Sequence, residues 1–186
     1  MGCDIHVRIE KLEDSKWVNM PWKNPDRNKY SKDHNPDGTL EIPDYFDARN
    51  YNLFAVLANV RNGTWGVRIP PIDSPRGFPE NSPIDIENGE YLGDHSFSYI
   101  TLKELQDYNW DAPYIYRASV SPEQAKALRE KGETPNSWAA WSSCGEQVEW
   151  KSTVREAVNN WPDDILPVLA SIGNPDEVRL VFGFDS

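Results

Sequence analysis

The chain opens with the stretch Met1-Gly2-Cys3-Asp4-Ile5-His6-Val7-Arg8-Ile9-Glu10, in which polar and apolar side chains alternate. Successive side chains of a β-strand point to opposite faces, so this period of two predicts a half-buried strand. Its apolar face carries Ile5, Val7 and Ile9, and we expect that face to pack on the core. Its polar face carries Asp4, His6, Arg8 and Glu10.

The other end of the chain repeats this pattern over residues 178–185. Its apolar side chains share one face of a second predicted strand: Val178, Leu180, Phe182 and Phe184. An apolar strand face must be buried against another layer of the fold. We therefore expect the first and last strands to lie in one sheet with a shared core face.

Helical spacing and capping residues predict helices between these two strands. In the segment 50–61 the apolar residues recur at helical intervals, and Gly63 stands where a C-terminal cap is expected. Thr101 and Glu104 form a capping-box pattern before a helix at 102–108. Cap and proline signals predict further helices at 121–132, 152–158 and from 162 onward. Alternation predicts strands at 16–20 and 114–120.

These elements predict a single α+β domain over residues 1–186. We expect a mainly antiparallel sheet that contains the N- and C-terminal strands, with the helices packed on one side. The segments 21–43 and 70–83, rich in proline and asparagine, are predicted to be long irregular loops. His34 falls in the first of them and reads as a solvated loop histidine.

Composition narrows the class of partner and the compartment. The formal net charge of −11 argues against general binding to duplex nucleic acid, which depends on basic residues that neutralise phosphates. The two cysteines, Cys3 and Cys144, are too few for a disulfide framework and are expected to be reduced in a cytoplasm. No apolar run approaches the roughly 20 residues that cross a bilayer. We therefore expect a cytoplasmic protein that binds no membrane.

Two pairs of residues suit acid–base or metal chemistry. Asp4 and His6 are neighbours on the polar strand face, and Asp94 and His95 lie upstream of a predicted helix. Imidazole and carboxylate groups can move protons or bind Zn, Mn or Ni, so a divalent metal is an open option. We expect His6 and His95 to meet at a common cleft. The alternative is a solvated strand face in which His6 is structural.

A second group of residues suits an anionic ligand. Arg49, Asn50 and Tyr51 precede or open a predicted helix, whose first amides are expected to be free for a phosphate. Arg76 lies beside a glycine in the proline-rich loop and is expected to share that phosphate with Arg49. The alternative is that Asn50 caps the helix and Arg49 makes a surface ion pair. If Arg49 and Arg76 are instead structural, the aromatic residues between Trp138 and Trp150 are the next place to seek a site.

The chain resembles a family of small bacteriophage and bacterial proteins. The resemblance is carried by the Met1–His6 opening, 49–54, 59–61, 75–77, Asp94-His95-Ser96-Phe97-Ser98 and the ending 178–185. These six ordered motifs touch both termini and the middle of the chain. Family members often carry a second histidine where this chain has Phe97. The resemblance implies a phage-associated protein and, with it, an action inside the bacterial host cell.

These residue types support several classes of function. We expect the protein to capture a small phosphorylated, nucleotide-like molecule or to cleave it as a phosphodiesterase does. The resemblance suggests that this molecule is a bacterial defence signal. The catalytic candidates are Asp4, His6, Asp94 and His95, and the ligand-binding candidates are Arg49, Asn50, Tyr51, Arg61, Arg76 and Ser96. The alternatives are a non-catalytic acidic protein that binds a host protein, and a structural phage component. The common phosphate-loop, dinucleotide, metalloprotease and serine-hydrolase motifs are missing from the sequence.

Overall fold

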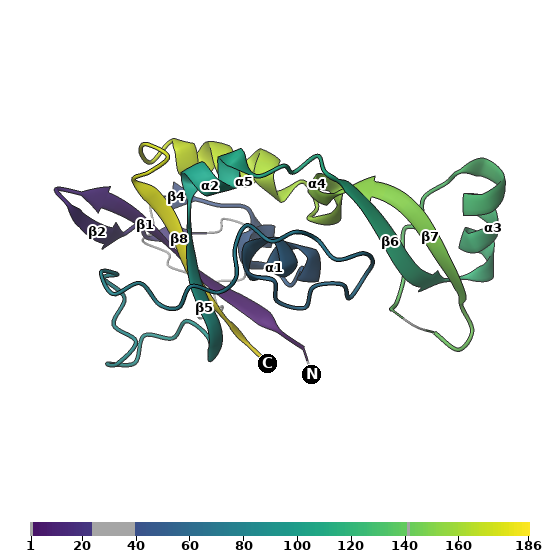
Figure 1. The fold of residues 1–186 in the computed structure, drawn as a ribbon, viewed down its shortest axis with the longest axis horizontal. Helices are drawn as coiled ribbons and strands as arrows, with labels where there is room; N and C mark the ends of the chain where they lie inside the picture. The colour runs from purple at the N-terminus through teal and green to yellow at the C-terminus, as the bar shows by residue number, and fades with distance from the viewer. Residues whose placement is uncertain (1, 24–39, 141) are drawn as a thin grey trace.

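The first and last strands lie side by side at the centre of a four-stranded antiparallel sheet (Figure 1). A computed structural model describes residues 2–23, 40–140 and 142–186. The sheet has the order β2-β1-β8-β5, with β1 at Asp4–Glu13, β2 at Lys16–Asn19, β5 at His95–Thr101 and β8 at Val178–Asp185. The predicted α+β class, antiparallel sheet and pairing of the terminal strands are confirmed.

The register of the central strands explains their alternating sequences. Ile5 pairs with Phe184, and Val7 pairs with Phe182, so the apolar side chains of both strands share one face. All four of these side chains are buried. The first strand also turns back into β2, which confirms the strand predicted at 16–20.

Three helices cover the apolar face of the sheet: α1 at Tyr51–Ala58, α2 at Leu102–Asp107 and α5 at Trp161–Ala170 (Figure 1). The ring of Phe54 on α1 lies 5.1 Å from the ring of Phe184, which joins this helix to the sheet. The capping box predicted at Thr101 and Glu104 is present at the start of α2. The prediction that α1 reaches residue 61 is wrong, because Asn59 adopts a left-handed conformation with φ 58° and ends the helix there.

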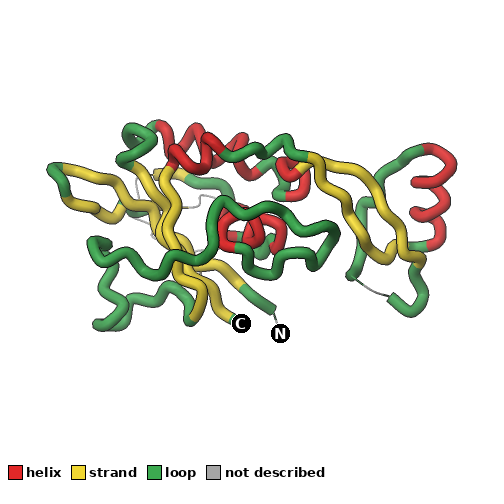
Figure 2. The backbone as a smooth tube through the Cα atoms, in the orientation of Figure 1, coloured by secondary structure: helices red, strands yellow, loops and turns green. Residues whose placement is uncertain are grey.

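The later part of a long loop, residues 78–94, covers the opposite face of the sheet. Between α1 and β5 the chain runs without helix or strand, which Figure 2 shows as a continuous loop. This confirms the irregular loop predicted at 70–83. Ile84 and Leu92 of the loop pack against Val181 of β8, so β8 is buried on both faces.

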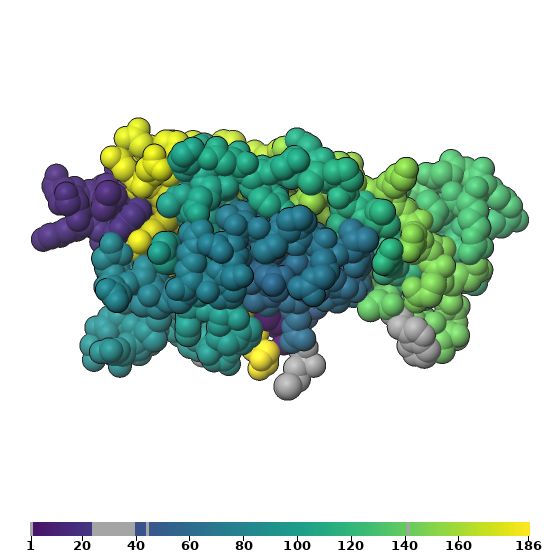
Figure 3. Space-filling model, viewed as in Figure 1, coloured from purple at the N-terminus to yellow at the C-terminus, as the bar shows by residue number. Residues whose placement is uncertain are grey.

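The segment 113–153 forms an arm at one end of the molecule (Figure 3). It consists of the antiparallel pair β6 (Pro113–Val120) and β7 (Glu146–Thr153), joined through α3 (Pro122–Lys131). The helix α4 (Val154–Ala157) follows directly and leads back to the body. Strand β6 and helices α3 and α4 were predicted from the sequence, whereas β7, in which Val148 and Trp150 are buried between exposed polar residues, was not.

The remaining elements are short. Strands β3 (Trp22–Lys23) and β4 (Leu40–Glu41) form a parallel pair, and a 3-10 helix, η1, spans Asp44–Asp47. Most of the loop predicted at 21–43, with His34, lies outside the described residues. Among the described helices, none combines the length and the apolar character that crossing a membrane demands.

Candidate functional site

Two loops attach to one edge of β6 and bring two tryptophans together. The backbone N–H of Val67 donates to the carbonyl of Ile115 (2.9 Å), and that of Arg117 donates to the carbonyl of Trp65 (3.0 Å). Ser119 and Ala139 exchange two backbone hydrogen bonds on the same strand. Trp65 and Trp138 are therefore held beside β6 by main-chain pairing.

Glycine is required where the first of these loops meets the strand. A Cβ atom on Gly66 would lie 2.2 Å from the carbonyl oxygen of Ile115 and 2.6 Å from the hydroxyl of Tyr114. Neither a backbone oxygen nor a buried ring can move aside cheaply. Gly66 thus permits the close approach that places the neighbouring Trp65.

A pocket of about 330 Å³ opens where the arm meets the body. Its walls come from the start of α1, the loop before β5, strand β6, the segment before β7, and the end of α4 with the turn that follows it. The lining residues are Arg49, Asn50, Tyr51, Asn52, Trp65, Tyr116, Trp138, Ala157 and Asn159. Junctions between structural units are common places for small-molecule sites, and this volume falls within their usual range.

The apolar walls of the pocket are aromatic rings. Tyr51 and Trp65 lie nearly parallel, with 17° between their planes and 6.5 Å between their centroids. Tyr116 and Trp138 meet edge-on at 5.3 Å, and Tyr116 stacks on Trp150 behind it at 4.6 Å. Trp138 is 39% exposed, which is unusual for so large an apolar side chain. An exposed tryptophan among further aromatic rings in a pocket suits a planar aromatic ligand.

Amide side chains supply the polar wall. Asn52 is buried and already bonded, since it accepts from the Tyr114 hydroxyl (3.1 Å) and donates to the carbonyl of Ala157 (3.2 Å). Asn159 is exposed, and its side chain makes no hydrogen bond to any described residue. Burial raises the pKa of Tyr116 to about 12, so its hydroxyl stays protonated at neutral pH. The amide of Asn159 is free to donate to and accept from a ligand.

Arg49 contributes the positive charge of the pocket, but it is shared with a carboxylate. Its Nε lies 2.8 Å from Oδ1 of Asp4, and its Nη2 lies 2.6 Å from Oδ2. These hydrogen bonds raise the pKa of the guanidinium above its ordinary value. Nη1 makes no hydrogen bond to the described residues and lies beside Gly2, and the Arg49 side chain is 52% exposed, so solvent reaches the guanidinium.

The start of α1 does not offer the free amides that the sequence analysis expected. The side chain of Asn50 accepts hydrogen bonds from the backbone N–H of Asn52 (3.0 Å) and of Leu53 (3.2 Å). The expectation of a phosphate held by these first-turn amides is therefore wrong. Asn50 caps the helix and Arg49 makes an ion pair, as the alternative interpretation stated.

The predicted two-histidine cleft is also wrong, because the histidines face opposite sides of the sheet. His6 pairs with Gly183, whereas His95 pairs with Phe184 and stacks on its ring at 6.0 Å. Adjacent residues of a strand point to opposite faces. His95 bonds to Ser96 (2.9 Å), and the described residues contain no group of three ligating side chains that could hold a metal ion.

Asp4 and His6 do lie near each other, yet both are engaged by structural partners. Nε2 of His6 lies 3.1 Å from a carboxylate oxygen of Asp185, whose other oxygen accepts from the backbone N–H of Asp4 (3.0 Å). Asp185 was missed as a partner, although antiparallel pairing of the terminal strands places it opposite Asp4. Asp94 is exposed, and its backbone N–H bonds to Phe184. The four proposed catalytic residues therefore do not form one site.

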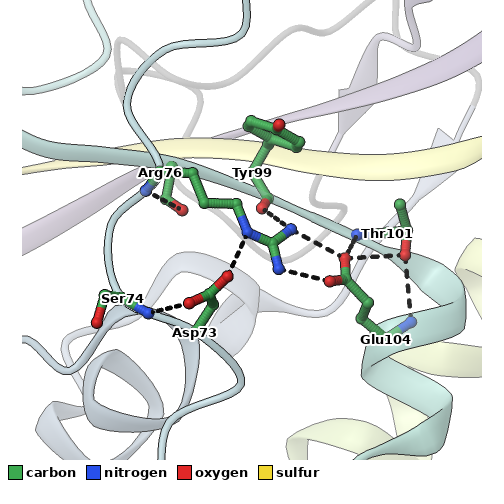
Figure 4. Close-up of polar contacts among 7 residues, drawn as sticks. Asp73, Ser74, Arg76, Tyr99, Thr101 and Glu104 are labelled. Atoms are coloured by element: carbon green, nitrogen blue, oxygen red, sulfur yellow. Dashed lines mark hydrogen bonds and ion pairs between the residues drawn. The ribbon is translucent and has the colours of Figure 1, made fainter.

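Arg76 is built into the fold (Figure 4). Its guanidinium bonds to Asp73 (2.8 Å), to the carbonyl of Tyr99 (3.0 Å) and through two nitrogens to Glu104 (2.5 and 3.1 Å). These bonds lower the pKa of the Glu104 carboxyl below its ordinary value. Through these four hydrogen bonds Arg76 holds the proline-rich loop to β5 and α2, and it lies outside the pocket lining.

Arg61 lies next to the pocket without lining it. Its guanidinium carbon is 5.9 Å from the centre of the Tyr51 ring, which is a cation–π distance. Burial raises the pKa of the Cys3 thiol, and Arg61 opposes this rise. Arg61 therefore supports the Tyr51 wall, whereas Ser96 belongs with His95 elsewhere.

The Asp185 contacts predict a pH dependence of stability. The hydrogen bond from His6, followed by that from the Asp4 backbone, lowers the pKa of the Asp185 carboxyl below its ordinary value. A lowered native pKa contributes stability that is present above the unfolded pKa of about 3.9 and is lost as pH falls through the native value. Asp185→Asn should therefore be less stable than wild type at neutral pH, and the difference should shrink below about pH 4. Urea unfolding across this range measures it, and a constant difference would contradict the assignment.

Sequence reasoning identified three lining residues, Arg49, Asn50 and Tyr51, and missed most of the others. Trp65, Tyr116 and Asn159 come from segments far apart in the chain and carry no local motif. Of the remaining lining residues, only Trp138 was predicted, because it belongs to the aromatic cluster that was the second candidate location. The two locations offered as alternatives are walls of one pocket.

Comparison with known proteins adds no further constraint. No protein-family model, curated protein or solved structure matches this chain. The resemblance to bacteriophage proteins therefore stays a prediction.

Proposed function

We propose that this protein captures a small phosphorylated, nucleotide-like molecule and releases it unchanged. The observation that carries this proposal is the pocket in which aromatic walls, a free amide and a guanidinium edge converge. Bases stack on aromatic side chains, amides read their polar edges, and a guanidinium pairs with phosphate. On the resemblance to bacteriophage proteins, we further propose that the molecule is a nucleotide signal of bacterial defence.

Capture is favoured over cleavage by the chemistry of the lining. None of the described lining residues is a histidine, cysteine, aspartate or glutamate. Histidine, cysteine, aspartate and glutamate are the usual general bases and nucleophiles of phosphoester hydrolysis, and the described lining supplies none of them. A binding role requires only complementarity, which the aromatic and polar walls supply.

Replacing Trp138 by alanine should weaken nucleotide binding by roughly 5- to 150-fold, because stacking of one base contributes about 1–3 kcal/mol. Adenosine, guanosine, cytidine and uridine and their phosphates serve as probes in isothermal titration calorimetry. Tyr91→Ala is a matched control, since Tyr91 is 53% exposed and lies outside the pocket lining.

The same samples distinguish capture from cleavage. After incubation and denaturation of the protein, chromatography should recover each bound probe intact. Conversion of a probe to product would contradict capture. If no nucleoside or nucleotide binds the wild-type protein, the proposed function is wrong.

A further inference from the structure

The charges around the pocket nearly cancel. Arg49 is the charged residue among the described lining, and its closest ionic partner is Asp4. Asp185 interacts electrostatically with Arg49 from the neighbouring strand, and Arg61 lies behind Tyr51. The carboxylates of Asp4 and Asp185 thus partly compensate Arg49, and the site offers one partly compensated positive charge to a ligand.

A ligand with several negative charges therefore finds no matching set of cations. The pocket lining contains no lysine and no second arginine among the described residues. The chain as a whole carries a formal charge of −11, so its field disfavours the approach of polyanions. One phosphate charge can pair with Nη1 of Arg49, whereas each additional charge is left without a partner.

The volume of the pocket limits the size of the ligand. Its volume of about 330 Å³ lies near the lower end of the range of roughly 300–1,000 Å³ found for small-molecule sites. The aromatic walls and the Asn159 amide are placed around this single space. It has room for one base with its sugar and phosphate, and a dinucleotide would extend into solvent.

We infer that the ligand is a mononucleotide with a single negative charge, which means a cyclic phosphodiester. Phosphomonoesters, polyphosphates and dinucleotides are expected to bind less well. A phosphomonoester carries about −1.5 to −2 charges at neutral pH, whereas a phosphodiester carries one. This inference rests on the proposed function. It adds that Asp4, through its ion pair with Arg49, is a specificity-determining residue.

Calorimetric titration with five adenine probes tests the inference: adenosine, 3′,5′-cyclic AMP, AMP, ATP and cyclic di-AMP, repeated with the guanine, cytosine and uracil probes. For the preferred base, the cyclic mononucleotide should bind at least about tenfold more tightly than the triphosphate or the cyclic dinucleotide. A triphosphate that binds as tightly as the cyclic mononucleotide would overturn the charge inference and leave the proposed function standing. Failure of every probe, the neutral nucleosides included, would instead refute the proposed function.

Two substitutions and a control variant test whether Asp4 and Arg49 determine the preference among nucleotides. Asp4→Asn removes the carboxylate that compensates Arg49, so it should strengthen triphosphate binding. The preference for the cyclic mononucleotide over the triphosphate should then fall by several-fold. Arg49→Gln should reduce cyclic mononucleotide binding to the level of the nucleoside. Arg117→Gln is the control, because its ion pair with Glu149 is exposed and lies on the arm outside the pocket lining. If Asp4→Asn does not fold, the ranking of probes by the wild-type protein decides the inference.

Discussion

Replacing Arg179 by methionine is expected to lower the free energy of unfolding by about 3–5 kcal/mol, because it leaves a buried carboxylate without its partner. Arg179 on β8 is 4% exposed and Glu10 on β1 is fully buried. Nε and Nη2 of Arg179 lie 2.7 and 2.6 Å from the same carboxylate oxygen. The guanidinium also lies 3.8 Å from the centre of the Trp17 ring.

The surrounding contacts show why water cannot replace the lost partner. Ser82 of the long loop donates to the other oxygen of Glu10, and Asn81 accepts from Arg179 (3.2 Å). The pair thus fastens the loop to the outer face of the sheet. Desolvation of an uncompensated charge at this place costs more than a lost surface contact.

Two further variants serve as comparisons for Arg179→Met. Arg117→Met breaks an exposed ion pair with Glu149 and should cost less than about 1 kcal/mol. The double variant Glu10→Met/Arg179→Met removes both charges and should recover part of the loss. Chemical denaturation measures all three. A loss for Arg179→Met no larger than that for Arg117→Met would show that the carboxylate is not buried in solution.

The same pair shows what alternation in a sequence can and cannot predict. The period of two placed Glu10 on the polar face of the first strand, and it is on that face. Alternation does not say what covers a face, and the loop 78–94 covers this one. The polar face was read as a solvated or catalytic surface, although part of it is a buried ion pair.

The candidate site was harder to predict because its walls meet only through tertiary pairing. Trp65 and Trp138 reach β6 through backbone hydrogen bonds that no local pattern encodes. Arg49, Asn50 and Tyr51 were predicted from the start of a helix, since capping chemistry is local. The role assigned to them changed once Asn50 was found to use the helix amides and Asp4 was found to hold Arg49.

Arg76→Glu is expected to destabilise the protein by about 2–4 kcal/mol, since it removes charge-assisted hydrogen bonds and adds a third carboxylate beside Asp73 and Glu104. The sequence predicted that Arg76 shares a phosphate with Arg49, and in that case charge reversal would abolish ligand binding and leave the fold intact. The structure reverses that expectation, because Glu104 is held by Arg76 and also accepts from the Thr101 backbone to cap α2. Loss of Arg76 therefore weakens both the loop and the helix start.

Lys103→Glu provides the control on the same helix. Lys103 forms an exposed pair with Asp107 one turn away, and its reversal should change the free energy of unfolding by less than about 1 kcal/mol. Arg76→Met removes the hydrogen bonds without adding a charge. Its loss in the free energy of unfolding should lie between the losses of Lys103→Glu and Arg76→Glu. If Arg76→Glu unfolds like wild type and yet binds no nucleotide, then Arg76 contacts the ligand after all. Loss of stability with nucleotide affinity retained in the folded fraction identifies it as a structural arginine.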